Sequence, residues 1–122
     1  MSRIQSVRKN TEFQSIYRTG KSRANRFFIM YCAPSSGDGR IGISVSKKVG
    51  NSVVRHRIKR LVKECYRLHR DEIRDGLDII VVARQDSKDK SYREIEGAFL
   101  HLLKLQHIRI GKANEHKPKE EP

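Results

Sequence analysis

The residues of this chain that are best suited to chemistry are the cations between positions 47 and 70. Apolar residues recur among them at the spacing i, i+4, i+7, i+8 and i+11, which predicts an amphipathic helix with one buried side. These residues are Val54, Ile58, Leu61, Val62 and Cys65. Most of the other positions hold Lys, Arg or His, and a single acid, Glu64, lies among them. Because like charges one helical turn apart repel, the pattern favours a polyanionic partner, although a solvated basic helix is the simpler alternative.

The composition indicates the same class of partner. The chain has 122 residues, with 27 Lys and Arg against 14 Asp and Glu, a formal net charge of +13 and an isoelectric point near 10.2. Such a charge speeds association with nucleic acid and makes the affinity fall with salt. We expect no membrane partner, because no spanning segment or lipidation motif accompanies the charge. We expect no DNA partner either, because a strand and a Gly-Asn loop, not a helix, precede the basic helix.

The sequence offers no residues for catalysis or for a metal site. The five histidines lack His-Glu-x-x-His spacing, and the acids near Gly76 and Ser87 form no metal-binding loop. The two cysteines, Cys32 and Cys65, fit small buried apolar residues better than a disulfide. We therefore expect no catalytic residue and no metal ligand. The N-terminus lacks the apolar run of a signal peptide, so we expect a cytoplasmic protein.

Three aromatic residues offer a second kind of contact. Phe13 and Tyr17 are one helical turn apart, and Tyr31 lies on a predicted strand. Together they could stack against single-stranded bases beside the cationic helix, at about 1–3 kcal/mol per base. The alternative is that all three rings belong to the hydrophobic core.

The elements that must position these residues can be placed from apolar periodicity and turn signals. We expect a short helix at 10–20 with Asn10 as its cap, strands at 26–33, 40–46 and 77–83, and a second long helix that begins at a capping box at 91–94. The first two strands alternate, so that alternate residues of each should face opposite sides of the sheet. The nearly continuous apolar run at 77–83 is typical of a central strand covered on both faces. The predicted fold is an α/β (α+β) two-layer sandwich of order α-β-β-β-α-β-α, with helices packed on a small, mostly antiparallel sheet. We expect one RNA-binding domain at 1–111 and a polar, disordered tail at 112–122.

The residues at 42–61, GISVSKKVGNSVVRHRIKRL, closely resemble the signature of the bacterial ribonuclease P protein family. The resemblance continues through 10–13 and 24–26 upstream and through 79–84 downstream, and it covers about residues 3 to 105. It implies a small basic subunit of an endoribonuclease, bound to a catalytic RNA. The two together remove the 5′ leader of precursor tRNA, using Mg²⁺ held mainly by the RNA and the substrate. The family fold also implies a left-handed β-α-β crossover, against the usual right-handed rule.

The resemblance also implies two groups of site residues. With further cations from the same helix, the residues expected to contact the catalytic RNA are Lys47, Lys48, Asn51, Arg55, His56, Arg57, Lys59, Arg60, Lys63 and Arg67. The residues expected to line a cleft for the leader are Phe13, Tyr17, Tyr31, Ser44 and Ser46.

The chain departs from the family pattern at one position of the basic motif. The usual Arg-Asn-Arg reads Arg55-His56-Arg57 here. Because imidazole can also donate, accept and stack, we predict that His56→Asn preserves function. A ribosomal or other structural RNA-binding protein shares the charge and the architecture, and only the extended signature separates it from this reading.

Overall fold

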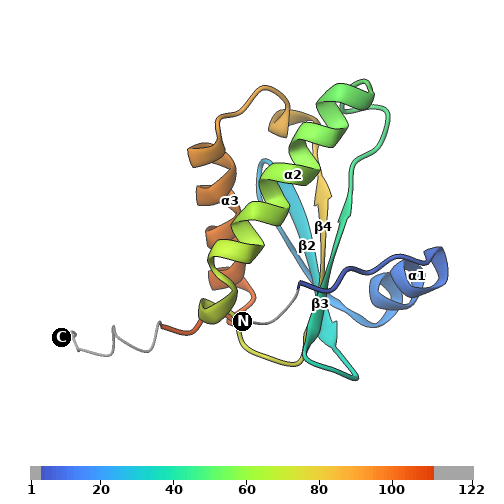
Figure 1. Ribbon diagram of the computed structural model, residues 1–122, viewed down its shortest axis with the longest axis vertical. Helices are drawn as coiled ribbons and strands as arrows, with labels where there is room; N and C mark the ends of the chain where they lie inside the picture. The colour runs from blue at the N-terminus through green and yellow to red at the C-terminus, as the bar shows by residue number, and fades with distance from the viewer. Residues whose placement is uncertain (1–3, 112–122) are drawn as a thin grey trace.

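The computed structural model describes residues 4–111, so the expected tail at 112–122 lies outside the described residues (Figure 1). The helices are α1 (Asn10–Thr19), α2 (Ser52–Leu68) and α3 (Tyr92–Leu105), and the strands are β1 (Lys21–Ala24), β2 (Phe28–Pro34), β3 (Gly39–Ser44) and β4 (Leu77–Ala83). Two short 3-10 turns, η1 (Arg70–Glu72) and η2 (Gln85–Ser87), flank β4. This is the predicted order α-β-β-β-α-β-α. The one strand for which the residue pattern indicated no range is β1.

The four strands form one sheet in the order β1-β2-β4-β3. The pairs β1/β2 and β2/β4 are antiparallel, and β3/β4 is parallel, so the predicted, mostly antiparallel sheet is confirmed. The helix α2 joins the parallel pair and makes β3-α2-β4 the expected β-α-β crossover. Strand β4 lies inside the sheet with Ile79, Ile80 and Val81 fully buried, as its continuous apolar run predicted.

The helices divide between the two faces of the sheet (Figure 1). The pair α2 and α3 covers one face and forms the larger core, in which Phe28, Met30, Ile58, Val62 and Phe99 are fully buried. The helix α1 lies against the other face, over a smaller core of Val7, Ile16, Ala33 and Ile80. Alternation along β2 and β3 decides which side chains face which layer.

The helix ends follow from local side-chain chemistry. Asn51 caps α2, where its Oδ1 accepts a hydrogen bond from the Val54 amide at 3.0 Å. Ser91 begins α3 with the predicted capping box. Asn10, the expected cap of α1, instead lies inside the first turn, and the cap is Lys9. The Glu12 carboxylate explains the difference, because it accepts the Lys9 amide at 3.3 Å and so satisfies the helix end in place of an Asn cap.

Candidate RNA-binding surface

The helix α2 separates an apolar side from a cationic side. Ile58, Val62 and Cys65 are fully buried against the sheet. All but one of the ten expected contacts to the catalytic RNA are exposed, and Arg55 is half-buried. We call these ten residues the cationic surface: Lys47, Lys48, Asn51, Arg55, His56, Arg57, Lys59, Arg60, Lys63 and Arg67.

Two arginines of the cationic surface are held by backbone carbonyl oxygens. Arg55 donates from Nε to the Gly50 carbonyl at 3.2 Å, next to the turn that precedes α2. Arg57 donates from Nη2 to the Lys90 carbonyl at 2.9 Å, near the start of α3. Each guanidinium has five N–H donors, so both retain donors for a ligand. Their positions are therefore fixed before a partner arrives.

The remaining cations differ in whether an acid neutralises them. Arg67 pairs with Glu64, with Nη2 and Oε2 at 2.6 Å, and this hydrogen bond lowers the pKa of the Glu64 carboxyl. Within residues 4–111, no side-chain hydrogen bond or ion pair holds five of the other cations. These are Lys47, Lys48, Lys59, Arg60 and Lys63. Phosphate groups would relieve the repulsion among them without breaking any contact of the fold.

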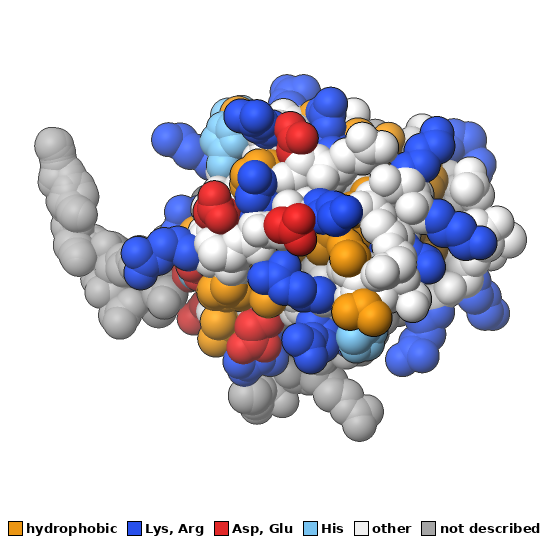
Figure 2. All heavy atoms as spheres, turned by 90° about the horizontal axis from the view of Figure 1, so that it is seen from above, with side chains coloured by type: hydrophobic (Ala, Val, Ile, Leu, Met, Phe, Trp, Pro, Cys, Tyr) orange, Lys and Arg blue, Asp and Glu red, His pale blue; other side chains and the backbone are white. Residues whose placement is uncertain are grey.

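The positive end of α2 adds to this charge. No acid lies in the first turn of α2, and Lys47 and Lys48 precede it. A helix N-terminus carries a partial positive charge, which ordinary proteins offset with Asp or Glu. Figure 2 looks onto the end of the molecule where α2 begins, and blue Lys and Arg side chains outnumber red acids there. This end therefore suits a polyanion.

The three aromatic residues lie together on the face of the sheet that α1 covers. The Phe13 and Tyr17 ring centroids are 6.2 Å apart, and Tyr17 meets Tyr31 edge-on at 4.8 Å. All three are half-buried, and they pack around the smaller core. We call Phe13, Tyr17 and Tyr31 the aromatic patch. It belongs partly to the core and partly to the surface, so the two sequence-based alternatives for these rings are not exclusive.

The strand register places a glycine beneath the aromatic patch. Tyr31 pairs with Ile80, and Ile80 pairs with Gly42, which lies under the Phe13 ring: a Cβ on Gly42 would meet Phe13 Cζ at 2.9 Å. Bulkier residues at position 42 would push the ring away.

The next row along the strands is formed by Ile29, Val82 and Ser44, and all three are half-buried. Ser44 thus lies on the same face as the aromatic patch, one row away. Ser46 is exposed beyond the end of β3, where its Oγ accepts the Lys48 amide at 3.3 Å. The structure therefore groups four of the five expected leader contacts on one face and places Ser46 in the turn that begins the cationic surface.

An ion cluster attaches α1 to the sheet beside the aromatic patch. Arg40 makes a two-point contact with Asp78, at 2.8 Å and 3.2 Å, and reaches Glu12 of α1 at 3.0 Å. Asp78 is only 4% exposed. Backbone amides of Lys9 and Arg8, and then Arg40, lower the pKa of Glu12, while Asp78 raises the pKa of Arg40. Glu12 and Arg40 are therefore charged, and the cluster holds α1 against the sheet beside its rings.

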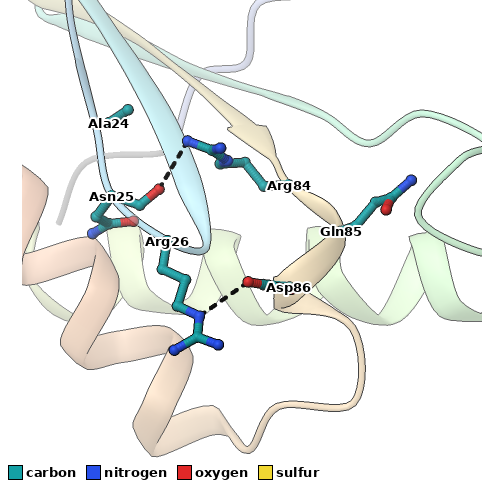
Figure 3. A pocket seen from close by; sticks show the side chains of 6 residues that line it. All are labelled: Ala24, Asn25, Arg26, Arg84, Gln85 and Asp86. Carbon is teal, nitrogen blue, oxygen red and sulfur yellow. Dashed lines mark hydrogen bonds and ion pairs between the residues drawn. The ribbon is translucent and has the colours of Figure 1, made fainter.

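A polar cavity of about 640 Å³ lies next to the cationic surface and was not predicted from the sequence (Figure 3). Arg26 pairs across it with Asp86 at 3.0 Å, and Arg84 donates to the Asn25 carbonyl at 3.3 Å. Gln85 connects it to the basic turn by donating to the Lys48 carbonyl at 3.4 Å.

The pairing of β2 with β4 would have been enough to predict this cavity. Arg26 precedes β2 and Arg84 follows β4, so the antiparallel pairing of these strands brings both arginines to the same end of the sheet.

Metal-binding and membrane-spanning features can be assessed over the same residues. Between residues 4 and 111, no group of three or more His, Cys, Asp or Glu side chains could hold a metal ion. No helix in this part of the chain is both long and apolar enough to span a bilayer. Burial raises the pKa of Cys32 and Cys65 to about 11, so both thiols stay protonated and act as apolar core groups.

Comparisons with known proteins agree with this geometry. The family model described as Ribonuclease P matches residues 1–106. The ribonuclease P protein component of Lachnoclostridium phytofermentans is 51% identical over 105 residues, covering 85% of this chain and 90% of that protein.

Solved structures agree as well. The RNase P protein of Staphylococcus aureus superposes with a TM-score of 0.81 at 40% identity, covering 88% of this chain and 99% of that one. The RNase P protein of Thermotoga maritima gives a TM-score of 0.76 at 29% identity, with coverages of 83% and 96%. The chain therefore belongs to the ribonuclease P protein family, the protein components of an endoribonuclease holoenzyme that processes the 5′ end of tRNA.

Proposed function

We propose that this chain binds the catalytic RNA of ribonuclease P through the cationic surface and the 5′ leader of precursor tRNA through the aromatic patch and Ser44. The observation that carries the proposal is the juxtaposition of two different surfaces. In strand β3, Gly42 lies under Phe13 and Ser44 ends the strand, and the chain reaches Lys47 three residues later. One RNA strand could therefore stack on the rings while a second RNA meets the unpaired cations.

The two surfaces divide the work by their chemistry. Unpaired cations on an exposed helix contact phosphates, which supplies affinity with little sequence preference. Half-buried rings stack on bases of a single strand, and they do so for any base. A leader of variable sequence is bound well by such a patch. The proposed site of action is the cytoplasm.

The proposal assigns bond cleavage to the RNA and not to this chain. The cationic surface holds no carboxylate and a single histidine, His56, so it lacks the paired histidines or carboxylates that commonly serve as general acid and base. In the proposed holoenzyme, Mg²⁺ is held by the RNA and the substrate and supplies the metal-activated water for hydrolysis. The role of the chain is to bind precursor tRNA and to neutralise phosphate repulsion where the two RNAs meet.

Cleavage of precursor tRNAs with leaders of different length tests this function. A bacterial ribonuclease P RNA would be assayed at low Mg²⁺ with and without the protein. We expect strong stimulation that grows with leader length, and no cleavage by the protein alone. Tight RNA binding without stimulation would contradict the proposal and favour a structural RNA-binding protein.

A pair of matched variants separates the two surfaces. Tyr17→Leu with Tyr31→Leu removes stacking but keeps apolar volume, and should weaken binding of long-leader substrates by about 5- to 150-fold while leaving short-leader substrates unchanged. Lys59→Gln with Lys63→Gln removes two unpaired cations and should weaken holoenzyme assembly whatever the leader length. Equal effects of both double variants on all substrates would contradict the division.

A further inference from the structure

A second basic cleft lies at the edge of the sheet farthest from β3. Its volume is about 460 Å³, and it is formed between β1 and the C-terminal end of α3. The residues that line it are Arg23, His101, Lys104, Leu105 and His107. Two of these are cations, two are histidines, and none is an acid. Because the sheet order is β1-β2-β4-β3, this cleft and the turn that begins the cationic surface lie at opposite edges.

The hydrogen-bond network fixes the tautomer of His101. The Asn25 Oδ1 accepts the amides of Phe27 and Phe28 at 3.2 Å and 3.0 Å, so its amide group has one orientation. Asn25 Nδ2 must then donate, and it does so to the Ala98 carbonyl at 2.9 Å and to His101 Nδ1 at 3.2 Å. A neutral imidazole that accepts at Nδ1 carries its hydrogen on Nε2. His101 is therefore held as a donor toward any ligand that meets Nε2.

The backbone at the end of α3 holds His107 in place as well. His107 has a φ of 60°, a left-handed conformation that is uncommon outside glycine. Its amide donates to the Lys104 carbonyl at 3.0 Å, and its carbonyl accepts from Arg74 Nη2 at 2.8 Å. Both backbone groups are thus used, and the side chain is left on the exposed rim of the cleft.

A glycine on α3 extends the same surface. Arg93, Gly97, His101 and Lys104 follow each other at i, i+4, i+8 and i+11, so they share one side of α3, and all four are exposed. A Cβ on Gly97 would meet nothing within 4 Å, so packing within the described residues does not require glycine there. Glycine weakens an exposed helix. A bare position between cations instead allows an extended ligand to approach the helix closely.

We propose that this cleft binds a phosphate group of an RNA backbone, as a second anion site separate from the cationic surface. Lys104 and Arg23 supply charge, and the imidazole N–H of His101 supplies a fixed donor. Within residues 4–111, no acid lines the cleft to compete with the anion. RNA as the source of the phosphate rests on the proposed function, whereas the anion site itself does not.

Titration of the full chain with inorganic phosphate tests the site directly. We expect saturable shifts of the His101 and His107 ring signals in ¹H–¹³C NMR spectra. The double variant Arg23→Gln with Lys104→Gln should weaken this binding at least about tenfold, since it removes both fixed charges. The double variant Arg18→Gln with Lys88→Gln removes the same charge elsewhere on the surface and should behave as the unmodified chain. No saturable shift, or equal binding by both variants, would overturn the proposal.

A second arm identifies the source of the phosphate. Binding of a single-stranded RNA would be measured over a range of salt concentrations, without any catalytic RNA, so a failure of the proposed function leaves this test intact. Losing one phosphate contact should flatten the slope of log K against log[salt] by about 0.7, and only in the Arg23/Lys104 variant. Gly97→Glu, which has room for its side chain, should weaken RNA binding too. Phosphate binding with equal slopes in both double variants would overturn RNA as the ligand and leave a site for free phosphate.

Discussion

The two sides of this molecule use charge in opposite ways. Beneath α1, Arg40 is satisfied by two acids, Glu12 and Asp78, and this cluster attaches the helix to the sheet. On the outer side of α2, cations such as Lys59 and Arg60 have no such partner among the described residues. The first arrangement stabilises the fold, because the charge of Arg40 is used within the chain. The second stabilises nothing within the chain, so its charge is available to a polyanion.

Arg40→Met should have the largest effect on the structural side of this comparison. This change leaves Asp78, which is 4% exposed, without its two-point partner, and it releases Glu12. Removing one member of a buried pair is costly, so we expect a loss of about 3 kcal/mol in the free energy of unfolding, measured with urea. A loss below about 1 kcal/mol would mean that water replaces the guanidinium and that the cluster is not structural.

The same substitution on the other side is the matched control. Arg60→Met should change the free energy of unfolding by no more than about 0.5 kcal/mol, because Arg60 is exposed and pairs with no acid in the part of the chain that the structure describes. It should instead reduce the slope of log K against log[salt] for RNA binding by about 1. If both variants lost stability equally, the division between a structural and a binding region would be wrong.

Gly42→Ala tests the close packing beneath the aromatic patch. The new Cβ would meet Phe13 Cζ at 2.9 Å and Val7 Cβ at 3.0 Å, so the ring must move. We expect a loss of about 2 kcal/mol in the free energy of unfolding. We also expect weaker binding of long-leader substrates, because the displaced ring no longer stacks. Gly37→Ala, where the Cβ meets nothing within 4 Å, should leave both quantities unchanged. Unfolding in urea and binding of a leader-bearing substrate check the pair.

The sequence allowed the two regions to be predicted to different depths. Periodicity was sufficient for α2, because its stripe of apolar residues leaves one way to bury the helix. It also placed the faces of β2 and β3 correctly, and it found both long helices. The strand β1 was not located, because its four residues are all exposed and show no apolar alternation. Its pairing with β2 makes it a strand, and such a long-range contact has no local signature.

The contacts between regions could not be predicted at all. Nothing in the local pattern shows that Arg40 joins α1 to β4, or that Phe13 needs a glycine beneath it. Both depend on the strand register and on the path of the chain between elements. The cap of α1 was wrong for a related reason, since Glu12 reaches back and takes the role expected of Asn10.

A histidine at the C-terminal end of α2 should make the stability of the fold depend on pH. His69 bridges Glu72 and Glu96, with both contacts at 2.7 Å. Burial alone would lower the pKa of His69, but the two carboxylates outweigh it and raise the pKa above 6.5. A raised folded-state pKa adds stability that is fully present below the unfolded value and is lost as the pH rises through the folded value. As the pH rises from below 6.5 through the raised pKa of His69, the free energy of unfolding should therefore fall.

The control for that pH dependence is His69→Gln, which cannot be protonated and should remove this part of the fall. The affinity for RNA at constant salt should fall in this variant only as far as its lower stability explains, because His69 lies outside the cationic surface. A pH profile that is identical in the two proteins would show that the bridge carries no linked proton.

The smallest effect should come from His56→Asn, on the cationic surface itself. His56 is exposed, and no side-chain hydrogen bond or ion pair holds it within residues 4–111. The free energy of unfolding should change by no more than about 0.5 kcal/mol, and affinity for the catalytic RNA should be preserved, since an amide keeps a donor and an acceptor at the same place. Arg57→Ala is the contrasting variant, because it removes a charge and the hydrogen bond to the Lys90 carbonyl. An affinity loss in His56→Asn as large as that of Arg57→Ala would show that the imidazole makes a contact of its own. The binding region would then depend on a specific side chain at position 56 and not only on unpaired charge.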